Sequence, residues 1–426
     1  MKVLLVSHTV LSKTGNMGKT LRGYLADFAP EDIAQFYIHS EVPTDDTRCT
    51  NYYRFTDVDA LKSLWPFRQR GVHFGPQDIQ PERTTTRTDS GAVGEIYQFG
   101  RKRSGGIYLM RNLLWKLGHW KTPKLKAWLR EVDPDVILFA SGDYSFMYDI
   151  ARWMAEFLNK PLVVSCMDDY YIYNANQDTA IGRFQHKLYL NTVRRTMDRA
   201  SCILAICDSM RDAYAELFQK PCYVLHTSAE EKTLTLNPNA QQLSYLGNLG
   251  FDRNLQLCKI GRAAKKIGRW VDVYSGEKNP EILSVLTEEN GIHYHGSIPA
   301  SEVLKVMEQS LAVIHTEAFD EKNKQEVRFS VSTKIAESLM YGPCLLAFGP
   351  EGIASIDYLK QNRAAYVITR EEDLTAGLQD LTTNAALRKE LLENARALAR
   401  KNHSSSVNPQ KVRAWLQAAA EGKGLE

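Results

Sequence analysis

The chain has 426 residues, of which 44% are hydrophobic and 24% charged, so its length and composition indicate a globular protein of two or three domains. The formal net charge of +3 is small for this length and disfavours a general nucleic-acid binder, which would be more basic. The seven cysteines are scattered and form no C-x-x-C pair, which argues against both a disulfide framework and a zinc site. The sequence starts directly on an apolar strand, and neither a signal peptide nor a bilayer-spanning run is recognised, so we expect a cytoplasmic protein.

The first predicted strand and the turn after it begin an α/β unit. Residues 1–8, MKVLLVSH, are typical of a buried strand, and residues 19–28 have helical spacing. The turn between them holds Gly15 and Gly18 in a G-x-x-G-K-T string, but a P-loop requires a Gly where this chain has Lys13. The spacing therefore argues against an ATP site. The start of the following helix still favours an anion, although a plain turn without a ligand is equally compatible.

The rest of the first half alternates between strands and helices. Further strands are predicted at residues 135–140, 161–167, 202–207 and 222–226. Helical patterns lie between them, and the alternation predicts a parallel sheet covered on both faces, in a domain of residues 1–228.

Residues 101–130 form a basic segment that no Asp or Glu interrupts. Its basic residues are Arg101, Lys102, Arg103, Arg111, Lys116, Lys121, Lys124, Lys126 and Arg130. Trp115, Trp120 and Trp128 lie among them with several leucines, a combination that favours an anionic membrane surface. A solvated basic helix face that covers the sheet is the alternative, because aromatic residues at helical spacing are often core. RNA binding is disfavoured, since no RNA-recognition motif accompanies the charge.

A polar segment separates the two halves of the chain. Residues 229–241 have no apolar period and contain Asn-Pro-Asn, so they are predicted to be a linker. A second α/β domain follows at 242–405. Its strands are predicted at residues 243–248, 271–276, 292–296, 311–316 and 344–349. A helix within 406–426 ends the chain, and we expect it to pack back on the first domain.

The stretch VRFSVSTKIAESLMYGPCLLAFG contains a helix start of unusual composition. Ser332 and Thr333 are N-cap candidates, and Lys334 falls in the first turn, where positive charge is normally unfavourable. A lysine there is understandable if the helix start binds an anion, and Glu337, one turn deeper, could accept hydrogen bonds from a sugar diol. An ordinary capped helix with a surface Lys and Glu is the alternative.

Residues 332–347, STKIAESLMYGPCLLA, resemble the nucleotide-sugar segment of GT-B fold glycosyltransferases, especially glycosyltransferase family four (glycosyltransferases group 1). Other stretches resemble further segments of this family in the same order: DPDVILFASGDYSF, DRASCILAICDSMRDAYAELF, YLGNLGFDRN and IHYHGSIPASEVLKVMEQSLAVIHTEAF. The resemblance covers most of the chain except residues 40–105. It implies an α/β fold with two Rossmann-like domains that face a central cleft, where a nucleotide-sugar donor binds.

The resemblance also implies donor-binding residues in both domains. Gly15 and Gly18 match a turn that approaches the donor phosphates, so the opening loop would face a sugar nucleotide rather than ATP. Asn248 and Gly250 lie in the turn after the first strand of the second domain, and Arg253 is near the position of a basic phosphate-binding residue.

The remaining donor contacts are implied further along the second domain. His295 and Gly296 match the place where backbone groups meet the nucleobase. Residues 332–334 would hold the diphosphate, and Glu337 the ribose.

The chain departs from the family pattern at two positions. Many members have an additional Glu eight residues before the one at Glu337, where it contacts the transferred sugar, and this chain has Phe329 there. Asn248 replaces an Arg found in many members.

Adjacent carboxylates follow one strand of the first domain, in CMDDYYIY. Side chains of neighbouring strand residues point to opposite faces, so Asp168 and Asp169 are not expected to share a metal. One of them could face the acceptor as a base or a sugar contact, with helix capping or a salt bridge as the alternative. Asp143 is a further candidate of the same kind. His8, after the first strand, could lie near the cleft or be a satisfied structural histidine.

The residues and the resemblance together predict a hexosyltransferase that needs neither a cofactor nor a metal, because Lys, Arg and a helix start can stabilise the departing phosphate. Lys334 and Glu337, with Asp168 and Asp169, are the expected catalytic residues. The expected donor is a UDP- or GDP-sugar, the acceptor a polysaccharide or lipid-linked glycan intermediate, and the stereochemical outcome retention. The protein would then lie in the cytoplasm, peripheral to the inner face of the cell membrane. A sugar-nucleotide epimerase or hydrolase of the same fold, and a non-catalytic nucleotide-binding assembly protein, stay open as alternatives; Phe329 favours the second.

Overall fold

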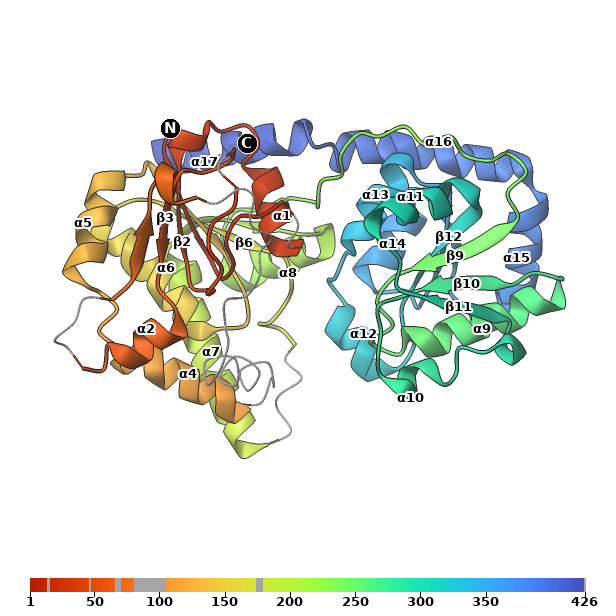
Figure 1. The fold of residues 1–426 in the computed structure, drawn as a ribbon, viewed down its shortest axis with the longest axis horizontal. Helices are drawn as coiled ribbons and strands as arrows, with labels where there is room; N and C mark the ends of the chain where they lie inside the picture. Colours follow the sequence, from red (N-terminus) through yellow and green to blue (C-terminus); the bar gives the residue numbers. More distant parts are fainter. Residues whose placement is uncertain (14–15, 46, 66–69, 80–104, 174–178, 425–426) are drawn as a thin grey trace. The chain divides into compact units, whose positions relative to one another are not determined.

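A computed structural model describes the chain apart from residues 14–15, 46, 66–69, 80–104, 174–178 and 425–426. The described residues form two compact units, each built around one sheet (Figure 1). Unit 1 comprises Met1–His226 with Asn408–Glu426, and unit 2 comprises Thr227–Val407. Beside the longer helices there are short 3-10 turns at Pro30–Asp32, Pro76–Asp78, Glu288–Asn290 and Glu371–Asp373.

Unit 1 contains an eight-stranded sheet in the order β4-β3-β2-β1-β5-β6-β7-β8. Its strands are β1 (Val3–Ser7), β2 (Ile33–Tyr37), β3 (Asn51–Arg54), β4 (Val72–Phe74), β5 (Val136–Ala140), β6 (Leu162–Cys166), β7 (Ala200–Ala205) and β8 (Cys222–Val224). Neighbouring strands are parallel except β3 and β4. The predicted parallel sheet is confirmed, and its central strands are buried along their whole length because helices cover both faces.

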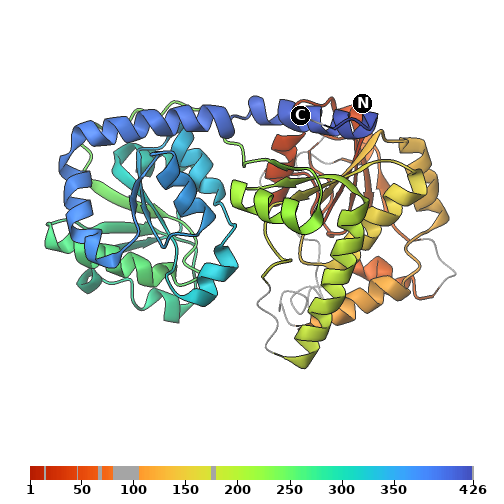
Figure 2. The same ribbon diagram turned by 180° about the vertical axis from the view of Figure 1, so that it is seen from behind.

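The helices of unit 1 lie on both sides of this sheet (Figures 1 and 2). They are α1 (Asn16–Tyr24), α2 (Asp57–Lys62), α4 (Gly105–Leu117), α5 (Pro123–Val132), α6 (Ser145–Leu158), α7 (Ala180–Arg199), α8 (Asp208–Phe218) and α17 (Val407–Glu421). Threonine N-caps fix three of the starts. The Thr56 hydroxyl accepts from the Asp59 N–H in α2, the Thr122 hydroxyl from the Leu125 N–H in α5, and the Thr179 hydroxyl from the Gly182 N–H in α7.

The tryptophans of the basic segment belong to the core of unit 1. Trp115, Trp120 and Trp128 are 1%, 7% and 3% exposed. The Trp115 and Trp128 indoles donate to carboxylate and amide oxygens of Asp57 and Asn51, each at 2.7 Å, so their polar edges are satisfied inside the unit. The expectation that these tryptophans contact a membrane is therefore wrong. The basic residues at 101–103 lie outside the described residues.

Unit 2 contains a six-stranded parallel sheet in the order β11-β10-β9-β12-β13-β14. Its strands are β9 (Gln242–Leu246), β10 (Val271–Tyr274), β11 (Ile292–Gly296), β12 (Ser310–Thr316), β13 (Cys344–Phe348) and β14 (Tyr366–Ile368). Its helices are α9 (Arg253–Lys266), α10 (Pro280–Leu283), α11 (Ala300–Gln309), α12 (Glu321–Val327), α13 (Thr333–Tyr341), α14 (Ala354–Gln361), α15 (Leu374–Thr383) and α16 (Ala385–Asn402). Numbered along the chain, the strand order is 3-2-1-4-5-6, the order of a doubly wound dinucleotide-binding sheet.

The last helix, α17, packs into the core of unit 1. Val412 and Leu416 are fully buried in the same cluster as Val3 and Phe28 of the N-terminal segment. The Trp415 ring stacks on Tyr223 with ring centroids 5.4 Å apart. Of the helices in the described parts of the chain, none combines the length and apolar character needed to cross a bilayer.

Truncating a buried side chain of α17 should destabilise unit 1. Leu416→Ala removes a fully buried side chain, and we expect the free energy of unfolding to fall by about 2–5 kcal/mol. Gln417→Ala, on the exposed face of the same helix, should change it by less than about 0.5 kcal/mol. Denaturant unfolding followed by tryptophan fluorescence measures both, because Trp270 is the single tryptophan of the sequence that lies in unit 2. Equal effects of the two variants would contradict the docking of α17.

Candidate functional site

The chain reverses its strand order in unit 2 between β9 and β12. These strands are neighbours and parallel, but β10 continues the sheet on one side and β13 on the other. The segments that leave their carboxyl ends therefore diverge, and in open α/β sheets ligands bind in the crevice at such a switch point. The residues at this edge of the sheet are the first candidates for a ligand site.

A buried ion pair ties the two sides of the switch point together. Arg253, the first residue of α9, makes a bidentate contact with Glu317, which follows β12 directly, at 3.0 and 2.9 Å. Glu317 is 2% exposed. Burial acts to lower the pKa of the Arg253 guanidinium, but the charge and hydrogen bonds of Glu317 outweigh burial and raise it. Arg253 thus lies at the switch point of the sheet, with its guanidinium paired to a carboxylate.

Glu317 was not among the residues predicted from the sequence. The signal available was a charged residue immediately after the apolar run of β12, because such a residue is placed at the carboxyl edge of the sheet. His315 lies beside it, with its Nε2 atom 2.9 Å from the Ser355 hydroxyl and 3.6 Å from the Glu317 carboxylate. Burial lowers the pKa of His315 despite the Glu317 charge.

Lys334 brings a second cation to the same edge. Its Nζ atom donates to the carbonyl of Leu246, the last residue of β9, at 2.7 Å. The loss of water around the ammonium lowers the pKa of Lys334, Glu337 acts to raise it, and Arg253 adds to the lowering. Helix α13, which carries Lys334, therefore directs its first turn toward the end of β9.

The N-cap of α13 agrees with the sequence prediction. The Ser332 hydroxyl accepts from the Lys334 N–H at 3.4 Å, and Thr333, the first helical residue, is exposed. Two candidate phosphate ligands, a hydroxyl and an ammonium, thus meet at one helix start, where backbone N–H groups favour an anion.

The turn after β9 is held by its own side chains. The Asn248 amide oxygen accepts from the Gly250 N–H at 2.7 Å, and Phe251 and Asp252 follow with φ of 59° and 53°. Both Asn248 and Gly250 therefore lie at the carboxyl end of β9, on the same edge as Lys334 and Arg253.

The predicted nucleobase contacts lie farther along this edge. Gly296, at the end of the outer strand β11, has φ of +74° and open space where a side chain would stand. The preceding His295 ring stacks on Tyr274 and contacts the Asp272 carboxylate at 2.6 Å. The imidazole is thus engaged with β10. The Gly296 carbonyl accepts from the Ser275 N–H at 2.9 Å, so the open part of this strand end is the space beside the Gly296 Cα.

Glu337 and Phe329 flank the start of α13 differently. Glu337 lies one turn into the helix and is half-buried, and its charge acts on both Lys334 and Tyr341. The Phe329 ring is buried, with the Arg328 guanidinium carbon 5.0 Å from its centroid. The family position of the additional Glu is therefore occupied by a core residue.

In unit 1 the opening turn is shaped by packing. A Cβ atom on Gly18 would lie 2.5 Å from the Val10 carbonyl oxygen, so only glycine lets α1 approach the segment after β1 this closely. Gly15 lies outside the described residues.

The two adjacent aspartates after β6 have different surroundings. Asp169 accepts four hydrogen bonds, from the backbone N–H groups of residues 171–173 at 3.0–3.1 Å and from the Tyr214 hydroxyl at 2.7 Å. Four bonds occupy the accepting capacity of a carboxylate, so Asp169 organises its loop. Asp168 is exposed and has the Tyr170 hydroxyl at 3.5 Å.

His8 marks the switch point of unit 1, between β1 and β5. The His8 ring stacks on the Tyr144 ring, with centroids 5.4 Å apart. The Arg111 guanidinium carbon also lies over the Tyr144 ring, 3.9 Å from its centroid. Burial, reinforced by the charges of Arg111 and His39, lowers the pKa of His8 to about 3, so the imidazole is neutral near pH 7. Asp143, in the same loop as Tyr144, accepts from the Tyr108 hydroxyl.

Metal-ligating side chains do not gather in the described part of the chain: no three His, Cys, Asp or Glu residues there are placed to hold an ion.

Comparison with protein families and solved structures identifies relatives for both units. The family profile of Glycosyltransferase Family 4 matches residues 85–229, and the profile described as Glycosyl transferase-like matches residues 254–414. No curated protein matches the chain.

Several solved structures share the fold over their whole length. The Anabaena protein Alr3699/HepE, in complex with UDP and glucose, superposes with a TM-score of 0.60 at 12% identity, over 98% of this chain and 100% of its own. Sucrose-phosphate synthase from Thermosynechococcus elongatus gives 0.61 at 10% identity, over 99% and 100%. An Escherichia coli structure described as trehalose-6-phosphate bound with UDP-2-fluoro glucose gives a TM-score of 0.59 at 12% identity, over 99% of both chains.

These matches confirm the resemblance seen in the sequence and the α/β fold expected from it. With a family four domain in its first half and a glycosyl transferase-like domain in its second, the chain is a glycosyltransferase of the GT-B type.

Proposed function

We propose that the chain transfers a sugar from a UDP-sugar to a polysaccharide or lipid-linked acceptor, with retention of configuration and without a metal. The observation that carries this proposal is the meeting of Lys334, Arg253 and the start of α13 at the β9–β12 switch point. A diphosphate bound there would face an ammonium, a guanidinium and backbone N–H groups.

The chemistry of the donor explains why these groups are needed. When the bond between the sugar carbon and the diphosphate oxygen breaks, negative charge develops on the departing phosphate. Lys334 and the N-terminus of α13 would stabilise that charge directly, because both are preorganised at one place. Arg253 would act at reduced strength, since Glu317 neutralises most of its charge.

The remaining residues have complementary proposed roles. Residues 248–250 would approach the diphosphate through the backbone, Gly296 would meet the base, and Glu337 would bind the ribose. In unit 1, Gly18 would approach the donor, and Asp168 would contact the acceptor while Asp169 holds its loop. We propose UDP rather than GDP as the donor nucleotide because HepE and the Escherichia coli structure are described with UDP or a UDP-sugar.

Sugar transfer should depend on the acceptor and should not depend on a divalent ion. We expect UDP release from a UDP-sugar to rise when a lipid-linked glycan is added, to persist in EDTA, and to give a product with the anomeric configuration of the donor. A coupled UDP-release assay and NMR of the product measure these outcomes. Full turnover without acceptor would indicate a hydrolase or epimerase instead, and loss in EDTA would contradict metal independence.

Removing the lysine at the helix start should weaken donor binding without unfolding the protein. Loss of one charge-assisted hydrogen bond is worth about 1.5–3 kcal/mol, so Lys334→Ala should weaken UDP binding by roughly ten- to hundredfold. Glu337→Ala should also weaken it. Lys322→Ala, which removes an exposed lysine of α12, is the matched control. Unchanged affinity in both site variants, measured by calorimetry, would refute the site assignment.

As the pH is raised, UDP affinity should begin to fall at a lower pH than it would if Lys334 had the usual pKa of a lysine. The pKa of Lys334 is lowered in the free protein, and a phosphate binds the charged ammonium, so affinity is full below that pKa and is lost as the pH rises through it. Lys334→Arg keeps its charge over this range and should show a smaller loss. Calorimetric titrations between neutral and alkaline pH compare the two proteins, which share every other titrating group. Parallel curves would show that Lys334 does not titrate in the site.

A further inference from the structure

Two neighbouring helices of unit 1 carry matching exposed apolar stripes. Of the twelve large apolar side chains that are exposed in the described residues, six lie on α4 and α7, between 38% and 57% exposed. They are Met110, Leu113 and Leu117 on α4, and Ile181, Phe184 and Leu188 on α7. Both sets have the spacing i, i+3, i+7, which places each set along one face of its helix.

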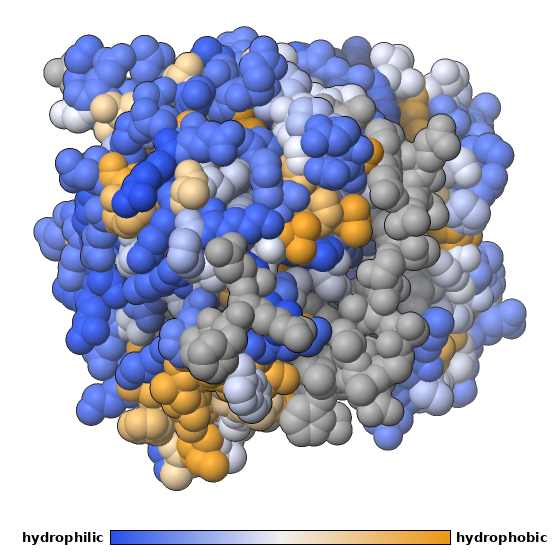
Figure 3. Space-filling model, turned by 60° about the vertical axis from the view of Figure 1, so that its left-hand side comes forward, coloured by the Kyte–Doolittle hydropathy of each residue, from blue (hydrophilic) through white to orange (hydrophobic). Residues whose placement is uncertain are grey.

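The two stripes belong to one surface. Figures 1 and 2 show α4 and α7 side by side, and a Cβ on Gly105 would lie 2.7 Å from the Cα of Gly182, so the helix starts are in close contact. Figure 3 shows apolar surface gathered at the lower end of the molecule, where these helices lie, among hydrophilic atoms. We call this surface, made by the exposed residues of α4 and α7, the α4–α7 face.

The charge on the α4–α7 face is almost entirely positive. Helix α4 contains no acidic residue, and α7 contains Asp198 alone. Its exposed basic residues include Lys116, Lys187, Arg194 and Arg195, and none of these four forms an ion pair within the described residues. The surface therefore combines apolar side chains with uncompensated cations.

A pocket of about 710 Å³ opens beside the stripes, between α4, α6 and α7. Four cationic side chains line it, Lys116, Lys121, Arg152 and Arg195, against two carboxylates, Asp149 and Glu156, for a net charge of +2. Leu188 of the α7 stripe also lines it, so the pocket and the apolar surface are continuous.

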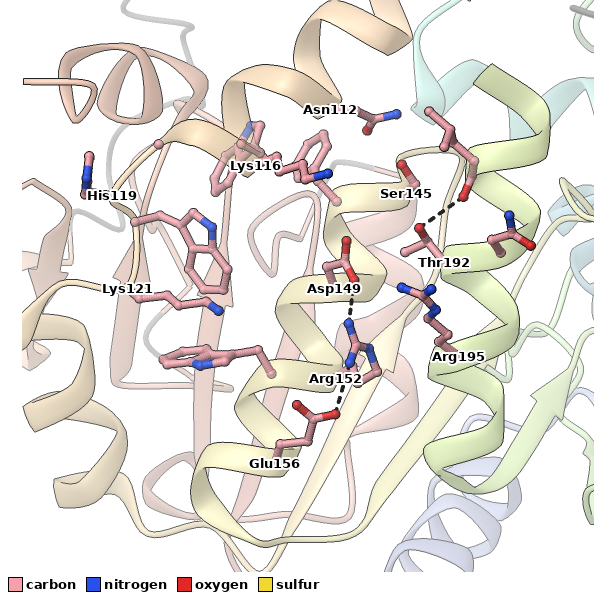
Figure 4. Close-up of a pocket in the computed structure, with 17 residues that line it drawn as sticks. Asn112, Lys116, His119, Lys121, Ser145, Asp149, Arg152, Glu156, Thr192 and Arg195 are labelled. Carbon is pink, nitrogen blue, oxygen red and sulfur yellow. Dashed lines mark hydrogen bonds and ion pairs between the residues drawn. The ribbon is translucent and has the colours of Figure 1, made fainter. Parts of the chain in front are cut away.

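The carboxylates do not neutralise the pocket evenly. Both bind Arg152, at 2.8 and 3.1 Å, which leaves the other three cations to a ligand. Figure 4 shows Lys121 and Arg195 on opposite sides of Arg152, with Lys116 at the other end of the pocket, beyond Asp149. The buried amide of Asn112, a further lining residue, has no hydrogen-bond partner among the described residues. An anionic group with several acceptor oxygens would satisfy these donors.

We propose that the α4–α7 face docks on an anionic phospholipid bilayer, with the stripes at the boundary of headgroups and acyl chains and a headgroup phosphate in the pocket. A second copy of the chain is disfavoured as the occupant, because it would bring two positive faces together. Nucleic acid would use the cations but not the apolar stripes. The inference rests on the proposed function, in which the acceptor is lipid-linked. It assigns the membrane contact to exposed residues of α4 and α7 instead of the buried tryptophans.

Vesicle sedimentation of the full chain tests this inference. We expect binding to vesicles of equal parts phosphatidylcholine and phosphatidylglycerol, much weaker binding to phosphatidylcholine alone, and loss of binding at high salt. Leu113→Ser with Phe184→Ser, and separately Lys116→Glu with Arg195→Glu, should each weaken binding by at least about tenfold. All four side chains are exposed, so the variants should fold, which circular dichroism verifies.

Matched substitutions in unit 2 serve as controls. Leu255→Ser and Lys389→Glu replace comparably exposed side chains and should leave vesicle binding unchanged. Absence of binding to the anionic vesicles, or equal binding by all variants, would overturn the inference, as would self-association through this face without vesicle binding. A thermal shift with UDP, measured on the same proteins, separates this failure from failure of the donor site, because the α4–α7 variants should keep the shift.

Discussion

The buried contact between Arg253 and Glu317 is the interaction on which the donor edge of unit 2 depends. It joins the first residue of α9 to the residue after β12, across the point where the strand order reverses. Removing either partner would leave an uncompensated charge in a buried place, which costs several kcal/mol, so the pair fixes the spacing between the two diverging segments. Lys334 then reaches the end of β9 from a third segment, so an ammonium lies at the crevice beside the Arg253–Glu317 pair.

This arrangement also explains why the lysine tolerates its position. A cation in the first turn of a helix is opposed by the helix dipole, and its ammonium loses water as it folds against β9. Glu337, one turn away, offsets part of this cost. A bound diphosphate would remove the conflict, because it attracts both the ammonium and the helix N-terminus. A lysine in the first turn of a helix is thus unfavourable for the helix alone, and such local conflicts are expected at functional sites.

Much of the fold could be predicted because strand periodicity and length are local properties. The apolar runs of β1, β5, β6 and β9 are long enough to be recognised, and their alternation with helices determines the fold class. The short β14 and the strands β2–β4 were not predicted, since pairing with neighbours defines them more than their composition does.

The candidate site was predictable in part for the same reason. Residues 332–334 could be found from the cap and the misplaced lysine, which are sequence-local. The contacts of Lys334 with Leu246 and of Arg253 with Glu317 join residues that are distant in the chain, so hydrophobic periodicity could not predict them. Helical spacing likewise could not distinguish tryptophans that face the core from tryptophans that face a membrane. The exposed stripes became visible only when α4 and α7 were placed together.

The most direct measurement is the structure of the full chain with UDP bound. The account predicts that the diphosphate lies within hydrogen-bonding distance of the Lys334 ammonium and of the N–H groups at the start of α13, with the ribose at Glu337. A diphosphate bound elsewhere, with the Lys334 ammonium still donating to the Leu246 carbonyl, would contradict it.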